Sequence, residues 1–439
     1  MSKVAVIGGG ISGIASAYYF NQHHIDVDLY DAAESIGGRI GSGFLGDFSV
    51  DFGGKNIGRK YKRFRRFVSD FGDLPFEYFG FNTSQVIGGK VIKINKEKAG
   101  LYSLMRLFYL CGLKGFIRLY PLVQAVKGDY TQGALNSSYF NDVADQNDHH
   151  SLSLFFGKRC SRYVIRPVTV RMNGAEPEEC YPGNFGSNLA LALDSYEQLQ
   201  GGMSGLLQAF SAGASSTRII TGYNVHRLEF DSSSSNVNLI CYNKAKSKEL
   251  KYKKVLLALP AKDASLLFKY SLPRLSELLE KVVYYPVAVA IAKYQKDVFQ
   301  SDLRAMVFDN SSLLSNAGAY GINDLDLVRY TFSGIASRKL ITSETNPENV
   351  ISIAEKIIEK YFNVKGNKRE NYVYKYLDPG LCAYSSYHYK LLEKIDHILD
   401  PFCNIGLTGD YWRGASIEAC FRSAEEAVQK LIYKNAPQA

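Results

Sequence analysis

The chain has 439 residues, of which 46% are hydrophobic and 22% are charged, a balance typical of globular proteins. This length predicts two or three domains with an ample core, which excludes a disordered chain, a coiled coil and a small disulfide scaffold. The net charge of +9 comes without a nucleic-acid-binding motif, so we expect no nucleic acid as a partner.

The first predicted elements form a complete strand–helix–strand unit. An apolar run at residues 3–7 predicts a buried parallel strand, residues 12–23 predict a helix, and residues 27–30 predict the second strand. This order within so short a segment is typical of a parallel sheet with a crossover helix.

A glycine motif joins the first predicted strand to the helix. Gly8, Gly10 and Gly13 have the G-x-G-x-x-G spacing, which allows a tight turn, a close approach of the backbone to a pyrophosphate, and close packing of helix and strand. The N–H groups at the start of the helix, at Ile11 and Ser12, would face the phosphates. The motif and its flanking elements predict a dinucleotide-binding unit.

The residues after the second strand extend this predicted site. Asp31 ends the strand 18 residues after Gly13, where its carboxylate can accept hydrogen bonds from ribose hydroxyls. Residues 34–39, ESIGGR, would bring the backbone of Gly38 and the guanidinium of Arg39 close to a cofactor's diphosphate or ring system.

A second glycine turn is followed by a basic segment. Residues 50–58, VDFGGKNIG, contain Gly53 and Gly54. Residues 59–66 then hold much of the excess positive charge. This basic run fits a solvated helix face, or a site for an anionic substrate, partner or membrane surface.

The helical middle of the chain contains two further features. Residues 101–126 are mostly apolar but are interrupted by bases, so they predict an amphipathic helix pair that covers a pocket or touches a membrane, or else a buried helical layer. Arg166 and Arg171 flank a short apolar segment and could bind a carboxylate bidentately, with structural ion pairing as the alternative.

Strands return in the second half of the chain. Residues 225–230 and 237–242 predict a hairpin around a serine-rich turn at residues 231–235, and residues 250–260 predict another strand. Residues 404–430 predict a strand, a glycine turn and a final helix.

The cysteines and the N-terminus indicate a reducing compartment. The seven cysteines include no CxxC pair, and we see no secretory signal, so we expect reduced thiols in a cytoplasmic protein with peripheral membrane contact as an option. Metal-ligand spacing is absent, so we expect no metal site. No uncharged apolar stretch is long enough to predict a transmembrane helix.

Five motifs together resemble the flavin amine oxidases and their relatives, the protoporphyrinogen oxidases and phytoene-type desaturases. They are VAVIGGGISG with Asp31 and ESIGGRI, then VDFGGKNIG, the segment 194–210 with its GGM turn, the segment 225–260 ending in ALP, and GLTGDYWRGASIEACFRSAEEA. The resemblance runs along the whole chain. It implies FAD as the cofactor, bound non-covalently because Cys420 lies inside the last helix, and it implies a small-molecule substrate with dioxygen or another electron acceptor.

The resemblance also implies roles for individual residues. The backbone of Val225 would meet the adenine, and Gly409 and Asp410 would lie near the ribityl–diphosphate arm. Ile417 would begin a helix whose N-terminus stabilises the negative charge of reduced flavin. The complete set of implied cofactor-binding residues is Gly8, Gly10, Ile11, Ser12, Gly13, Asp31, Gly38, Arg39, Gly53, Gly54, Val225, Gly409, Asp410 and Ile417.

The chain departs from the amine oxidases at two places. They carry a lysine in the strand that enters the substrate domain, where this chain has Val289, with Lys293 only at the strand end. Ser416 falls near one position of their paired aromatic cage. Residues 151–179 and 284–292 look more like the protoporphyrinogen oxidase and desaturase branch.

Candidate catalytic residues cluster before and within the last motif. Tyr384, Tyr387 and His388 are close in sequence, and Trp412 lies at the final turn. His388 could act as a base or a hydrogen-bond partner because an imidazole titrates near neutral pH. A histidine without a chemical role is the simpler interpretation.

The predicted fold class is α/β, with a doubly wound FAD-binding domain interrupted by an α+β substrate domain. We expect residues 1–58, 195–264 and 400–439 to form the first domain, and residues 59–194 and 265–399 to form the second. The predicted function is hydride removal from a C–H of an amine, or of a conjugated or ring substrate, to flavin N5. A flavin-dependent sugar-nucleotide mutase and a non-enzymatic binding protein of the same fold are the alternatives.

Overall fold

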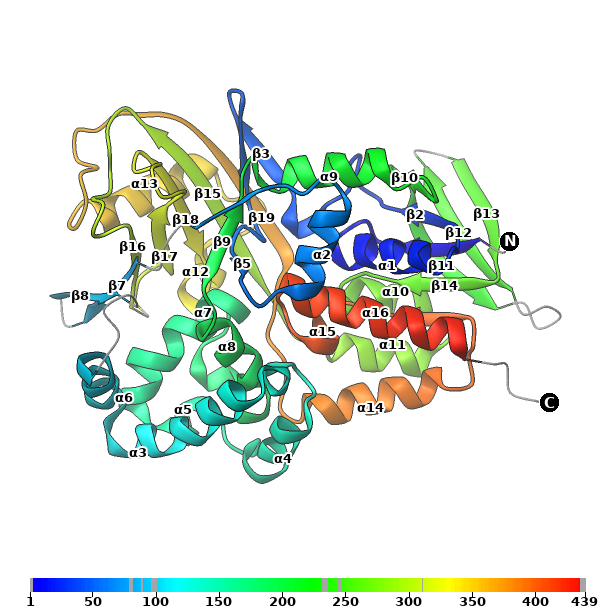
Figure 1. Ribbon diagram of the computed structural model, residues 1–439, viewed down its shortest axis with the longest axis horizontal. Coiled ribbons are helices and arrows are strands. Elements are labelled where there is room, and N and C mark those ends of the chain that lie inside the picture. Colours follow the sequence, from blue (N-terminus) through cyan, green and yellow to red (C-terminus); the bar gives the residue numbers. More distant parts are fainter. Residues whose placement is uncertain are drawn as a thin grey trace.

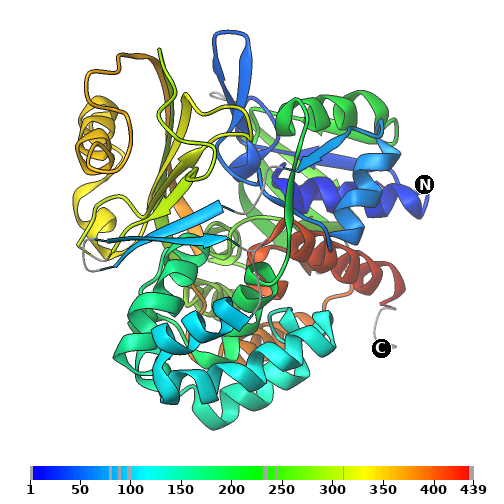
Figure 2. The same cartoon turned by 60° about the vertical axis from the view of Figure 1, so that its left-hand side comes forward.

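The structure is a computed structural model. In it, a parallel sheet with its helices lies beside a larger mixed sheet and a helical layer (Figure 1). The structure describes residues 3–78, 82–87, 90–95, 101–230, 236–243, 246–309 and 311–434. Figure 2 shows the mixed sheet above the helical layer, with the parallel sheet to one side of both.

The parallel sheet has five strands in the order β10-β2-β1-β14-β20. Their bounds are β1 (Val4–Ile7), β2 (Val27–Tyr30), β10 (Thr217–Ile220), β14 (Lys254–Leu257) and β20 (Ile405–Leu407). Both faces of this sheet are covered, which explains why its strands are short, continuous apolar runs. The predicted α/β, doubly wound fold class is confirmed.

Helices from distant parts of the chain cover one face of this sheet. They are α1 (Ile11–Gln22), α2 (Lys62–Asp70), α9 (Gly202–Gly213) and α16 (Ile417–Tyr433), whose apolar sides share one core with β1 and β2. The other face packs against α10 (Ala261–Phe268), α11 (Pro273–Glu280), α14 (His388–Leu399) and a three-stranded antiparallel sheet.

The three-stranded sheet consists of β11 (Asn224–Phe230), β12 (Val237–Asn243) and β13 (Lys246–Tyr252). The predicted hairpin is present as β11 and β12, while the predicted serine turn at 231–235 lies outside the described residues. The segment predicted as one strand at 250–260 is instead the end of β13 followed by β14, which belong to different sheets.

The mixed sheet has seven strands in the order β19-β15-β18-β17-β16-β7-β8. Their bounds are β7 (Asn82–Ile87), β8 (Lys90–Asn95), β15 (Tyr284–Tyr294), β16 (Ala305–Val307), β17 (Asn316–Ala319), β18 (Leu327–Phe332) and β19 (Arg369–Cys382). Helices α12 (Ile335–Leu340) and α13 (Pro347–Ile358) accompany it. Val289 and its neighbours on β15 pack against Val50 and Phe52, so one face of this sheet reaches the second glycine turn.

The helical layer lies below the mixed sheet in Figure 1 and fulfils the prediction of helices at residues 101–126. The chain bends sharply at Gly112 within α3, so α3 is a pair of helices joined by a kink. The helices of this layer are α3 (Leu101–Gly128), α4 (Ser138–Asn147), α5 (Leu152–Phe156), α6 (Lys158–Cys160), α7 (Arg166–Asn173) and α8 (Phe185–Ala192).

Short elements connect these layers near the predicted cofactor site. The hairpin of β3 (Ser42–Leu45) and β4 (Phe48–Asp51) leads into the second glycine turn. A small sheet of β5 (Ile57–Gly58), β9 (Tyr196–Leu199) and β6 (Phe76–Tyr78) follows it, and α15 (Asp410–Arg413) precedes α16.

Candidate functional site

The loop between β1 and α1 forms a cradle that fits a diphosphate. A Cβ atom added to Gly13 would lie 1.8 Å from the carbonyl oxygen of Gly8, so only glycine allows this approach of helix and strand. A Cβ on Gly10 would meet no protein atom within 4 Å, so Gly10 borders open space. The N–H groups of Ile11 and Ser12 lie in the first turn of α1, where they have no intrahelical acceptor. These residues fit the diphosphate of FAD.

Asp31 holds the same loop from the end of β2. Its carboxylate accepts hydrogen bonds from the backbone N–H of Gly9 at 2.7 Å and of Ala33 at 2.8 Å. A carboxylate has about four acceptor positions, so two bonds leave room for ribose hydroxyls. The predicted ribose contact therefore remains a prediction, and Asp31 has a structural role beside it.

We expect Asp31→Ala to weaken FAD binding without unfolding the protein. The variant loses a charge-assisted acceptor worth about 1.5–3 kcal/mol, so the FAD dissociation constant should rise on the order of 10- to 100-fold. Fluorescence titration of the apoprotein measures the constant, and circular dichroism checks the fold. Asp31→Asn is the control, since it keeps one acceptor oxygen and should give a smaller loss. An unchanged dissociation constant would show that Asp31 does not bind the cofactor.

Arg39 links the first glycine loops to the last motif. Its Nη1 donates to Asp410 Oδ2 at 2.6 Å and to the carbonyl of Gly380 at 3.0 Å, and Tyr284 donates to the other oxygen of Asp410 at 2.7 Å. Within the described part of the chain, its other N–H groups form no hydrogen bond, and 34% of the side chain is exposed. These donors are available to a cofactor diphosphate or flavin.

The second glycine turn packs between Arg39 and the start of α16. A Cβ on Gly53 would lie 2.4 Å from the carbonyl oxygen of Arg39. Gly54 has φ +68°, and a Cβ there would meet the side chains of Ile40 at 2.8 Å and Ile417 at 3.0 Å. The turn and the helix start, both predicted to contact flavin, are therefore neighbours.

The last motif supplies a glycine turn and a capped helix. Gly409 follows β20, and its N–H donates to the hydroxyl of Ser423 at 3.3 Å. Ser416 caps α16, because its Oγ accepts from the N–H of Ala419 at 3.1 Å. Ser416, which we predicted to fall near an aromatic-cage position, is therefore the N-cap of the helix that begins at Ile417.

Gly38 and Val225, two other residues predicted to bind the cofactor, have only main-chain atoms to offer. Gly38 lies beside Gly10, since a Cβ on Gly38 would be 3.2 Å from the Cα of Gly10. Val225 pairs with Cys241 between β11 and β12, just before a bulge, and its side chain is buried in the core. Their proposed contacts to FAD would therefore use main-chain atoms.

Lys55 is a buried lysine that the sequence reasoning did not select. It follows Gly54 directly, and its Nζ lies 4.8 Å from the centre of the Tyr320 ring. Burial and the nearby Arg329 charge lower the pKa of Lys55 to about 7. A neutral amine near neutral pH is a usable base, so Lys55 becomes a candidate catalytic residue.

The mixed sheet fixes the turn that carries Lys55. Arg329 on β18 donates to the carbonyl oxygens of Asp51 at 2.6 Å and of Phe52, and the N–H of Asp51 donates to the Tyr320 hydroxyl at 2.7 Å. Asp51 also accepts from the N–H of Met203 at 3.1 Å. Lys55 therefore sits on a rigid turn between the two sheets.

The predicted catalytic cluster braces the backbone of the last motif. His388 is fully buried, and its Nε2 donates to the carbonyl of Tyr411 at 2.8 Å, while the Tyr384 hydroxyl donates to the carbonyl of Asp410 at 3.0 Å. Burial lowers the pKa of His388 to about 4, so the ring is neutral.

Tyr387 and Trp412 take no part in the two hydrogen bonds that His388 and Tyr384 donate. The N–H of Tyr387 donates to Asp148 Oδ2 at 2.9 Å, which ties it to the end of α4. Trp412 packs beside Leu399 and Leu407. The catalytic roles proposed for these residues and for His388 remain predictions.

An apolar cavity lies between the helical layer and the mixed sheet. It has a volume of about 180 Å³ and is lined by Leu107 and Leu110 of α3, Val168 of α7, Leu191 of α8 and Val307 of β16. The cavity suits an apolar part of a small molecule.

Two polar residues join the apolar wall of this cavity. Tyr196 lines it and pairs with Gly58, three residues after Lys55 in the chain. Arg171 also lines it, donates to the carbonyl of Pro167 at 2.8 Å, and forms no ion pair with any described residue. Burial lowers the pKa of Arg171, but a guanidinium stays charged, so this side chain could bind an anion.

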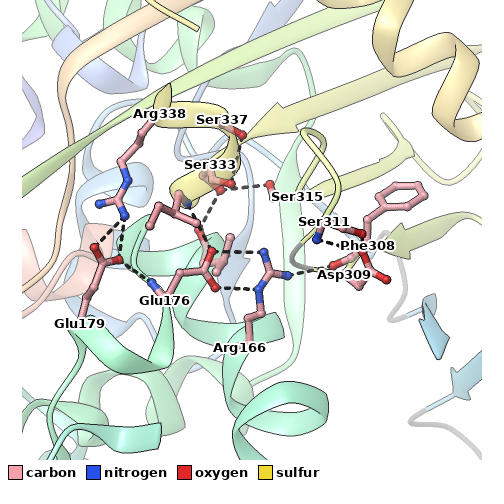
Figure 3. A network of polar contacts seen from close by, with 12 residues as sticks. Arg166, Glu176, Glu179, Phe308, Asp309, Ser311, Ser315, Ser333, Ser337 and Arg338 are labelled. Carbon is pink, nitrogen blue, oxygen red and sulfur yellow. Dashed lines mark hydrogen bonds and ion pairs between the residues drawn. The ribbon is translucent and has the colours of Figure 1, made fainter. Parts of the chain in front are cut away.

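Arg166 has a structural role instead (Figure 3). Its guanidinium donates to Glu176 at 2.7 and 3.3 Å and to the carbonyl of Phe308 at 3.1 Å. Glu179 continues the network by accepting from Arg338 at 2.7 and 2.8 Å. The network fastens α7 to the mixed sheet, so the alternative of structural ion pairing holds for Arg166.

Three arginines of the basic run at residues 59–66 form ion pairs. Arg59 and Arg65 bind Glu197, and Arg63 binds Glu425 at 2.6 Å and Glu418 at 3.6 Å. These carboxylates are far from the basic run in the sequence, so the ion pairs could not be predicted from residues 59–66 alone.

Val289 and Lys293, the two residues considered for the position of the amine oxidase lysine, lie in different surroundings, and the assignment of Val289 to that position stays a prediction. Val289 is buried against Val50 and Phe52, whereas Lys293 lies at the end of β15 in an ion pair with Asp326. Lys293 is 42% exposed and therefore turned toward solvent.

A dinucleotide cradle and an apolar cavity within one chain are typical of a flavin-dependent oxidoreductase. The chain belongs to the family of flavin-containing amine oxidoreductases, whose model matches residues 11–432. This confirms the resemblance at the level of the superfamily, FAD as the cofactor and an enzymatic role. The seven cysteines are free thiols, and Cys420 is buried within α16, which agrees with non-covalent binding.

Similar proteins extend this finding. Over 240 residues the chain is 23% identical to prenylcysteine oxidase 1 of Pongo abelii, a match that covers 47% of this chain and 45% of that protein, so the chain spans about half of that relative's length. Cyclohexylamine oxidase from Brevibacterium oxydans IH-35A is 15% identical over 98% of each chain with a TM-score of 0.72. A fatty acid isomerase from P. acnes that produces CLA is 12% identical over 98% of each chain with a TM-score of 0.71. The two solved structures share the fold.

Searches of the described residues give two negative findings. No cluster of histidine, cysteine, aspartate and glutamate side chains there could hold a metal ion. Among the described helices, none combines the length and the apolar character needed to cross a bilayer.

Proposed function

We propose that this enzyme removes a hydride from a C–H of a lipophilic substrate that carries an anionic group. The C–H lies next to nitrogen or within a conjugated chain or ring. Bound FAD supplies the hydride acceptor at flavin N5. The protein's own task is to position the substrate and to exclude water.

The observation that carries this proposal is Arg171, which lies in the wall of an apolar cavity and has no ion-pair partner among the residues that the structure describes. A half-buried guanidinium in an apolar wall is better solvated when an anion pairs with it, whereas the surrounding leucine and valine side chains favour an apolar chain or ring. Two similar proteins are named for lipid-bearing compounds, prenylcysteine and a fatty acid, which supports a lipophilic substrate.

We assign Lys55 as the candidate proton acceptor and the residues around it as its support. Its neighbours Gly53 and Gly54 would bring it to the flavin, and Tyr196 links the same region to the cavity. The proposed FAD contacts are those of Gly8, Gly10, Gly13, Asp31, Arg39 and Ile417. We further propose that the discontinuous domain boundaries expected from the sequence separate the cofactor-binding part from the substrate-binding part.

The alternative of a sugar-nucleotide mutase has less support from the structure than from the sequence. That alternative depended on the basic run at residues 59–66 as a nucleotide-sugar site, and three arginines of the run are paired with protein carboxylates. The oxidoreductase family likewise replaces the non-enzymatic binding protein.

Anaerobic mixing with a substrate panel tests the proposal. The panel contains amines, amino acids, porphyrinogens and polyenes, each in a neutral and a carboxylated form where both exist, and bleaching of the flavin spectrum is followed. We expect bleaching by a lipophilic carboxylated compound, with Arg171→Met raising KM at least 10-fold for that form and leaving KM for its neutral analogue unchanged. Bleaching by neutral polar amines alone would contradict the proposal.

A further inference from the structure

Helix α3 presents a row of exposed apolar side chains to the outside of the molecule. They lie on both halves of the kinked helix, have exposed fractions of 45–69%, and are Met105, Phe108, Tyr109, Leu113, Ile117 and Tyr120. We call this set the α3 apolar face. It borders a surface hollow of about 580 Å³ between α3 and Arg159. A contiguous exposed apolar patch of this kind marks a protein or membrane contact.

The charges around this face have a single sign. Every charged residue in the segments 101–128 and 151–172 is basic. Lys114, Lys158, Arg159 and Arg162 are exposed, and the guanidinium of Arg159 lies 4.5 Å from the centre of the Tyr109 ring. Such a border repels a second copy of the same surface and attracts an anionic one.

The opposite side of α3 belongs to the protein interior. Leu119, Leu122 and Val126 are buried in the core of the helical layer, while Leu107 and Leu110 line the apolar cavity that contains Arg171. A single helix therefore separates the α3 apolar face from the candidate substrate cavity. Because α3 carries bases along its length, it can lie in an interface but has no apolar stretch to span one.

We propose that the α3 apolar face docks onto an anionic lipid bilayer, with its apolar side chains among the acyl chains and its bases at the headgroups. Because Leu107 and Leu110 of α3 line the candidate substrate cavity, this docking places one wall of that cavity at the membrane surface. That consequence rests on the proposed lipophilic substrate, whereas the docking itself does not.

Vesicle sedimentation of the FAD-loaded protein tests the docking without any substrate. Vesicles of phosphatidylcholine with roughly a third of phosphatidylglycerol are compared with pure phosphatidylcholine, since the bases near the α3 apolar face should be attracted to an anionic surface. We expect at least 10-fold stronger partitioning onto the anionic vesicles, and weaker binding at high salt. Leu113→Glu combined with Ile117→Glu should reduce partitioning at least 10-fold.

Leu266→Glu combined with Tyr270→Glu is the matched control. These side chains are also exposed and apolar but lie on and just after α10, so binding should stay within about 2-fold of the unaltered protein. The flavin spectrum confirms that each variant is folded.

Equal partitioning of the α3 variant and the unaltered protein overturns the proposal, and so does the absence of binding to anionic vesicles. Light scattering that shows a dimer, dissociated by the α3 variant, would assign the face to a second copy instead. Docking without turnover of any lipophilic compound would refute only the proposed substrate.

Discussion

Gly13→Ala is expected to abolish FAD binding and to destabilise the protein. The added methyl group would lie 1.8 Å from the carbonyl oxygen of Gly8, and the obstacle is backbone that cannot rotate away. Helix α1 must then move from β1, at a cost of about 1–3 kcal/mol or more for overpacking. The diphosphate cradle moves with it, so we expect less than a hundredth of the FAD affinity.

Substitutions at two other glycines distinguish a damaged FAD site from a destabilised fold. Gly10→Ala adds a methyl group where no protein atom lies within 4 Å, so the apoprotein should keep its Tm while FAD binding falls. Gly205→Ala, inside α9, also meets no atom within 4 Å, so it should leave FAD binding unchanged and raise the Tm slightly, because alanine favours a helix more than glycine does. The ratio of flavin to protein absorbance and the Tm of the apoproteins measure both effects. A Gly13→Ala protein with a full complement of FAD and an unchanged Tm would refute this account of the cradle.

Lys55→Met is expected to slow flavin reduction about 100-fold while FAD remains bound, the size typical of a lost general base. Burial lowers the pKa of Lys55 to about 7, so the folded protein holds a neutral amine above that pH and an ammonium below it. The reduction rate of the unaltered enzyme should therefore rise as pH increases through about 7. This rise should disappear in the variant.

Lys293→Met is the matched control for the lysine substitution. Lys293 pairs with Asp326 at the solvent-facing end of β15, so its loss should leave at least about a tenth of kcat, a barrier change of no more than about 1.4 kcal/mol. Stopped-flow reduction over a pH series measures both variants. If Lys293→Met removes the activity and Lys55→Met does not, the catalytic lysine is on β15 and our placement of it is wrong.

The cofactor side of the site could be predicted from the sequence because its signals are local. Gly8, Gly10, Gly13 and Asp31 lie within one strand–helix–strand unit, where spacing and apolar pattern determine the geometry. The strand at 250–260 was predicted too long, since an apolar run does not reveal that the chain changes sheets within it.

The substrate side depends on contacts between distant segments. Lys55 is buried because Tyr320 and Arg329 lie over its turn, and neither is near it in the sequence. Arg166 and Arg171 look alike in sequence, yet Glu176 neutralises the first and leaves the second facing a cavity. Local pattern carries no information on either outcome.

The order of strands in the parallel sheet has a consequence for how the protein is made. Strands β1 and β2 leave the ribosome first, but β14 and β20, which complete the sheet, follow only at residues 254–257 and 405–407. At about 5–20 residues per second the early strands wait on the order of tens of seconds for β14. Until then β1 lacks the strand that pairs with its second edge, although α1 can already cover one face of β1 and β2. Arg39 gains its partner Asp410 only when the last motif has been made, so we expect tight binding of the flavin to follow completion of the chain through α16.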